Sequence, residues 1–167
     1  PSGTITQLEF DRGLVRVQLV SGNYFSLLGV RASKGRALTP DDDRVPGAHP
    51  VAVLSDGYWR RRFGGAADVI GRTLGLNGTT YTVVGVAVRE FTGETTGRPV
   101  DIWLPMMMQS QVMLEMPGLL DRNNGWLHII GRMKPGVTVG QAQAAVQPTY
   151  RENEIAFAGS GATPQFI

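Results

Sequence analysis

The pattern of apolar and polar residues predicts short strands joined by tight turns over the first half of the chain. Leu14 to Val20 alternates between apolar and polar residues and is rich in branched side chains, as expected of a strand with one buried face. Arg16 and Gln18 would lie on the opposite face from the apolar set Val15, Val17 and Leu19. Pro1 to Arg12 are expected to form a loosely structured start of the chain.

The clearest local signal is a β-hairpin centred on Asn77-Gly78. These residues supply the two positive φ angles of a type I′ turn, and they lie between two strand-forming runs, Thr73 to Leu76 and Thr79 to Val88. The period of two divides the second strand into Tyr81, Val83 and Gly85 on one face and Thr80, Thr82, Val84 and Val86 on the other.

A helix is expected to follow a buried strand at Val51 to Leu54. Ser55 or Asp56 can cap it, because their side chains accept hydrogen bonds from the free N–H groups of a first helical turn. The helix would run to about Phe63. Thr39 to Asp43 is a second helix start, in which the aspartates favour the positive end of the helix dipole.

Toward the C-terminus, Met106 to Met116 is expected to be a helix and Trp126 to Met133 a strand. Thr138 begins a further helix, with Gln141 three residues on to complete a capping box. Pro148 is expected to kink or end this helix, because proline lacks the N–H that the helix would bond.

Composition narrows the class of protein. The chain has 167 residues, 42% hydrophobic and 18% charged, which indicates one ordinary folded domain or two small ones. A sequence without cysteine excludes disulfides, zinc–thiolate sites, iron–sulfur clusters and cysteine nucleophiles. A net charge of only +2 argues against nucleic-acid binding, which usually needs a clustered basic face. The sequence also lacks a run of about 18 apolar residues that could span a bilayer.

The densest positive cluster is Arg60, Arg61 and Arg62. It is the candidate contact for a partner, which could be a phosphate, lipid headgroups or an acidic protein. The alternative is a solvated helix face, with Trp59 and Phe63 four residues apart and turned into the core.

Catalytic and metal sites are not expected. The enzyme hypothesis would be a hydrolase that uses His49 or His128 with a carboxylate, but neither histidine has a nucleophile–base arrangement around it in the sequence. The Asp41 to Asp43 run lacks the ligand spacing of a calcium loop, and the glycine-rich stretches lack the Gly-Lys-Ser/Thr ending of a phosphate loop. No cofactor is therefore predicted.

Several motifs in order carry a resemblance to a known family. They are Val20 to Val30 with Gly35-Arg36, Pro50 to Ser55 with Trp59 to Gly65, Val69 to Thr73 with Leu76 to Gly78 and Tyr81 to Val86, Asp101 to Pro105, and Gly131 to Thr138. Together they extend over about Leu14 to Val146, and in this order they resemble the MacB-like periplasmic core domain.

The resemblance implies an α+β fold, a mixed α/β structure in which a porter-like part carries an inserted small α/β part. Residues 35–105 would form the insert, residues 1–34 and 106–158 the porter-like part, and residues 159–167 a flexible tail. The family usually has more chain before the first motif, so the N-terminal portion of the porter-like part is expected to be truncated. The two parts are expected to shift as near-rigid bodies about Asp121 to Gly125.

The resemblance also implies a non-catalytic role on the periplasmic side of the bacterial inner membrane, between the first and second transmembrane helices of an ABC-transporter permease. The partners would be its own transmembrane helices, a cytoplasmic ATPase domain or subunit and a periplasmic adaptor protein, in a dimeric full-length permease. Family members act in macrolide or peptide efflux, lipoprotein release and control of cell-wall hydrolases.

The second interpretation is a periplasmic module that binds a small ligand, peptide or lipid. A deep apolar pocket would favour this interpretation.

Overall fold

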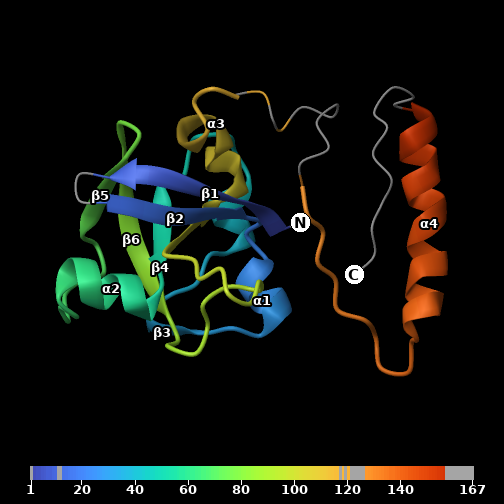
Figure 1. The fold of residues 1–167 in the computed structure, drawn as a ribbon, viewed down its shortest axis with the longest axis horizontal. Helices are drawn as coiled ribbons and strands as arrows, with labels where there is room; N and C mark the ends of the chain where they lie inside the picture. Colours follow the sequence, from blue (N-terminus) through green and yellow to red (C-terminus); the bar gives the residue numbers. More distant parts are fainter. Residues whose placement is uncertain (1, 11–12, 117, 119, 121–126, 157–167) are drawn as a thin grey trace.

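The computed structural model describes residues 2–10, 13–116, 118, 120 and 127–156. Its strands are β1 (Ser2–Phe10), β2 (Gly13–Val20), β3 (Ala32–Gly35), β4 (Val51–Leu54), β5 (Thr73–Leu76), β6 (Thr79–Ala87) and β7 (Ile102–Pro105). Its helices are α1 (Tyr24–Leu28), α2 (Asp56–Phe63), α3 (Gln109–Val112), α4 (Val139–Ala156) and the short 3₁₀ helices η1 (Pro40–Asp43) and η2 (Met106–Met108). The strands form the main body, and α4 lies apart from it (Figure 1).

The strands form one mixed sheet in the order β1-β2-β7-β4-β6-β3, with β5 paired to the first half of β6. The pairs β2–β7 and β4–β6 are parallel, and the remaining pairs are antiparallel. The predicted α+β fold is therefore confirmed. The division into an insert and a porter-like part stays a prediction, and the sheet crosses the proposed boundary where β2 pairs with β7.

Both faces of the central strands are buried. One face carries alternate residues of β2, β4 and β7, packed against α2, η2 and α3; they include Val17, Leu19, Ala52, Leu54, Ile102 and Leu104. The other face is covered by α1 and by the loop that joins β6 to β7; its residues include Val20, Phe25, Val53, Val100 and Trp103. This explains why Gln18, expected on an outer face, is completely buried.

The hairpin is confirmed, but one of its residues faces the other way. Asn77 and Gly78 have φ values of 48° and 80°, as a type I′ turn requires. Between Ala52 and Val53, the register of β4 with β6 shifts by one residue, so β6 carries an extra residue at that point. The extra residue reverses the alternation, and Val86 joins the buried cluster of Tyr81 instead of the opposite face.

Two predictions for the ends of the chain are wrong. The first residues form β1, a nine-residue strand antiparallel to β2, because the free edge of β2 offers main-chain partners that local sequence does not reveal. The predicted strand up to Met133 is absent from the described residues 127–133, where Ile129 is 83% exposed and Arg132 instead donates to the backbone oxygen of Leu27 at 3.0 Å. Trp126 lies outside the described residues.

The C-terminal helices also differ from expectation. The helix expected up to Met116 is instead η2 followed by α3, and it ends at Val112 because Met113 leaves the helical conformation. The capping box is confirmed, since the Thr138 N–H donates to Gln141 at 2.9 Å and Gln141 donates back at 3.3 Å. α4 continues past Pro148 to Ala156, so the missing N–H of Pro148 does not end the helix.

Among the described residues, none of the helices combines the length and apolar character needed to cross a membrane.

A glycine-to-alanine pair tests the packing of the sheet. A Cβ at Gly85 would lie 1.9 Å from the backbone oxygen of Arg36, whereas one at Gly75 would meet nothing within 4 Å. We expect Gly85→Ala to lower the free energy of unfolding by about 3 kcal/mol, because backbone must move to admit the methyl group. The control Gly75→Ala should change it by less than about 0.5 kcal/mol. Urea denaturation measures both, and equal effects would contradict the close approach at Gly85.

Candidate functional site

The helix α2 positions one wall of the site, and its local sequence explains where it begins and ends. Ser55 follows β4 directly, and its Oγ accepts a hydrogen bond from the N–H of Tyr58 at 3.2 Å, as the sequence predicts for a cap. At the other end, Gly64 takes a left-handed conformation with φ 62° and ends the helix.

The three arginines predicted as a partner contact lie on the exposed side of α2, and two are already paired within the chain. Arg60 bonds Asp56 one turn earlier at 2.8 Å, and Arg61 bonds Asp101 at 2.6 Å. Arg62 is exposed and has no ion pair with a described residue. The side chains of Arg60 and Arg61 are exposed, and exposed ion pairs add little stability. These guanidinium groups therefore remain accessible for a further contact.

Asp101 joins three elements at the edge of the site. Its carboxylate accepts the backbone N–H of Arg16 at 3.0 Å as well as the side chain of Arg61. Its own N–H donates to the backbone oxygen of Arg16 at 2.9 Å, and its backbone oxygen accepts from the N–H of Ser55 at 2.9 Å. Asp101, which leads directly into β7, thereby fixes the start of α2 against β2.

The loop between β6 and β7 is held on the sheet by a chain of polar side chains that begins at the buried Trp103 and Gln18 and ends at the exposed Glu94. The indole N–H of Trp103 donates to Gln18 at 3.0 Å, and the amide of Gln18 donates to Glu94 at 2.6 Å. The hydroxyl of Tyr24 also donates to Glu94. The ring of Phe91 stacks on Trp103 with centroids 5.3 Å apart. Burial first, and then the hydrogen bond and charge of Glu94, raise the pKa of Tyr24, so its hydroxyl remains a donor.

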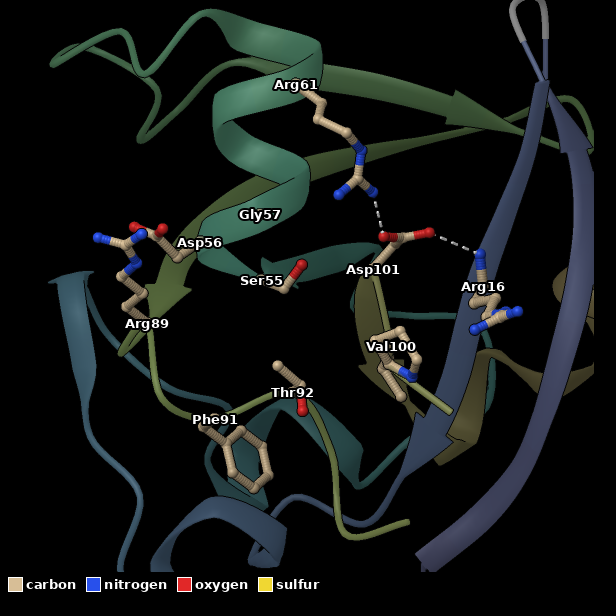
Figure 2. Close-up of a pocket in the computed structure, with 11 residues that line it drawn as sticks. Arg16, Ser55, Asp56, Gly57, Arg61, Arg89, Phe91, Thr92, Val100 and Asp101 are labelled. Atoms are coloured by element: carbon tan, nitrogen blue, oxygen red, sulfur yellow. Dashed lines mark hydrogen bonds and ion pairs between the residues drawn. The ribbon is translucent and has the colours of Figure 1, made fainter. Parts of the chain in front are cut away.

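A pocket of about 350 Å³ opens between α2, β2 and this loop (Figure 2). Its lining is Arg16, Ser55, Asp56, Gly57, Arg61, Arg89, Phe91, Thr92, Pro99, Val100 and Asp101. In Figure 2, Arg61 points from α2 toward Asp101, while Arg89 extends from the loop toward the start of α2. Arg16 and Arg89 have no ion-pair partner among the described residues.

Sequence reasoning found Arg61 but missed the other two arginines and Glu94. Arg16 was expected on the strand face opposite the apolar set, and Arg89 and Glu94 lie in a loop that has no local motif. Their positions depend on contacts with residues about 70 or more positions away, such as the bond between Glu94 and Gln18. Gln18 gave no signal either, because it alternates with apolar residues as a residue on the opposite face would.

The histidines do not contribute to this pocket. His49 is exposed in the loop before β4, and His128 is exposed in the segment that precedes α4. Neither residue belongs to the pocket lining. Within the described part of the chain, groups of three or more histidine, cysteine or acidic side chains that could hold a metal are absent.

The aspartates of η1 serve the local structure. Asp42 accepts from Arg36 at 2.8 Å and from the N–H of Thr39 at 2.8 Å. Burial alone would raise the pKa of Asp42, but these hydrogen bonds outweigh it and lower the pKa. Asp43 accepts from the N–H of Gly22 at 3.1 Å and of Met107 at 2.8 Å, and burial raises its pKa. The aspartates thus tie η1 to neighbouring segments, beyond the dipole effect that the sequence suggested.

Similarity to known proteins extends over most of the chain. A family model described as the MacB-like periplasmic core domain matches residues 2–149. The macrolide export ATP-binding/permease proteins MacB of Escherichia coli K12 and of Shigella dysenteriae serotype 1 are each 29% identical to the chain over 126 residues. The match covers 74% of this chain and 18% of each relative, so the chain spans a small part of their length.

Two solved structures share the fold. The periplasmic region of MacB from Actinobacillus actinomycetemcomitans has a TM-score of 0.55 and 16% identity, over 98% of this chain and 74% of that one. A domain of a protein described as a permease from Porphyromonas gingivalis has a TM-score of 0.55 and 16% identity, over 96% of this chain and 64% of that one. At this identity the likeness concerns the fold alone.

A pair of glutamates in the pocket loop tests the chain of polar side chains that ends at Glu94. Glu94→Ala removes the acceptor of Gln18 and Tyr24, and we expect the free energy of unfolding to fall by about 2 kcal/mol. Glu90 has no side-chain hydrogen bond or ion pair with a described residue, so Glu90→Ala should cost less than about 0.5 kcal/mol. Urea denaturation gives both values, and hydrogen exchange at the Val100 amide should accelerate in Glu94→Ala alone. Equal losses in the two variants would show that Glu94 does not hold the loop.

Proposed function

The chain belongs to the family of MacB-like periplasmic core domains, and from this premise we propose that it transmits ATP-driven movement within a bacterial ABC-transporter permease. The observation that carries the proposal is the family match over residues 2–149. In this role the domain carries out no reaction itself, and the energy comes from an ATPase domain or subunit in the cytoplasm.

The described sheet supports a mechanical role. Its central strands are packed on both faces, and Asp101 and Gln18 connect it to α2 and to the pocket loop. A close-packed body of this kind moves as a unit, because its interior has little room to deform. Movement applied at one end of such a body is passed to the other end.

The proposed surroundings follow from the family. The domain would lie on the periplasmic side of the inner membrane and contact its own transmembrane helices, in a permease that is dimeric at full length. A periplasmic adaptor would be a further partner, and Arg60, Arg61 and Arg62 are the proposed contact with it or with another acidic surface. The MacB relatives are macrolide export proteins, and for this chain efflux, lipoprotein release or another envelope process is the proposed task.

The proposed hinge is the segment Asp121 to Gly125, about which the porter-like part and the insert would shift as near-rigid bodies. This segment lies outside the described residues. Among the described residues that follow this segment, Arg132 bonds the backbone oxygen of Leu27 on the sheet body, whereas α4 lies apart from the sheet (Figure 1).

The native gene around the chain tests the proposed setting. We expect the coding sequence to give one transmembrane helix directly before the domain and three after it, with an ATPase domain in the same protein or in a neighbouring gene. Protease protection of the tagged parent protein in spheroplasts should then show this domain on the outer side. A cleaved signal peptide before it and a stop codon directly after it would contradict the permease proposal.

A further inference from the structure

The pocket beside α2 has a composition that suits a charged ligand. It combines arginines from three separate elements with the first turn of a helix and a small apolar floor. We propose that this pocket binds the phosphoryl group of an anionic ligand. The inference rests on the pocket and stands whether or not the domain transmits movement in a permease.

The balance of charge around the pocket favours an anion. The lining has three arginines against two aspartates. Asp56 is already paired with Arg60, which lies outside the lining, and Asp101 is paired with Arg61. The charges of Arg16 and Arg89 therefore remain uncompensated among the described residues. An anion in the pocket would compensate these two charges.

The directions of the donors favour a phosphoryl group over a carboxylate. A planar carboxylate is satisfied by one guanidinium fork, whereas a tetrahedral phosphoryl group has three oxygens that accept from several directions. Here the guanidinium groups come from β2, from α2 and from the loop, on different sides of the pocket (Figure 2). Ser55 and Gly57 add the positive end of the α2 dipole. The helix alone would not make a site, but its partial positive charge adds to the charge of the arginines.

The floor of the pocket leaves room for a short apolar portion next to the phosphoryl group. Phe91, Pro99 and Val100 line it, and the ring of Phe91 is fixed by its stacking on Trp103. A volume of about 350 Å³ exceeds what a single phosphate needs. The ligand would be a phosphate monoester as readily as free phosphate, or a phospholipid headgroup, whose phosphodiester presents two of these oxygens and a single charge.

The test is a set of titrations followed by NMR on the 15N-labelled chain at neutral pH and constant ionic strength. The probes are inorganic phosphate, glycerol 3-phosphate and dihexanoylphosphatidylglycerol below its micelle concentration. We expect saturable shifts of the Gly57 and Thr92 amides. The double variant Arg16→Gln/Arg89→Gln should bind the tightest of the probes about tenfold more weakly or worse. The control Arg44→Gln/Arg72→Gln removes the same charge from surface pairs with Asp41 and Asp68, and should retain affinity within about twofold.

The three probes distinguish the source of the phosphoryl group. Tighter binding of the short-chain lipid than of glycerol 3-phosphate indicates a lipid headgroup, and equal binding of all three indicates free phosphate or a small ester. The proposal is overturned if no probe gives saturable shifts at the pocket at up to about 10 mM, or if the double variant binds as tightly as the control. If the double variant does not fold, Arg89→Gln alone decides, because that side chain is exposed in a loop.

Discussion

The side-chain amide of Gln18 lies on β2 without access to solvent, so both of its polar ends need partners inside the protein. Its oxygen accepts the indole N–H of Trp103, and its nitrogen donates to Glu94. Leaving such a group unpaired would cost about 1–3 kcal/mol. The loop from β6 to β7 is therefore held on the sheet by a requirement of the core. Because the same loop supplies Arg89 and Phe91, the shape of the pocket depends on this buried amide.

The parts of the fold that local chemistry determines could be predicted from sequence. The Asn77-Gly78 turn and the Ser55 cap depend on backbone conformation and hydrogen bonds within a few residues, and both are found as expected. Pairing at a distance could not be predicted in this way. The strand β1 exists because β2 has an edge to pair with, and Val86 changes face because a bulge lies two residues earlier, against β4.

The candidate site shows the same limit. The sequence predicted a partner contact at three consecutive arginines. In the structure two of them have intramolecular partners, and one, Arg61, lies in a pocket with Arg16 and Arg89. Those two come from positions more than 70 residues apart, and parallel pairing of β2 with β7 brings their elements together. The proposed transmission of movement and the proposed binding of an anion are compatible, because Asp101 lines the pocket and also joins α2 to β2.

Distance measurements between spin labels in the full-length parent protein test the central claim, that ATP-driven movement is passed on by a shift of the packed sheet body against α4. Ile70 on the sheet body and Val146 on α4 are 40% and 53% exposed, and Val45, 52% exposed, provides a second position on the sheet body. The account predicts that the distance between labels at Ile70→Cys and Val146→Cys changes between the nucleotide-free and ATP-bound states, while the distance between Ile70→Cys and Val45→Cys does not. An unchanged Ile70–Val146 distance across the ATP cycle would contradict it.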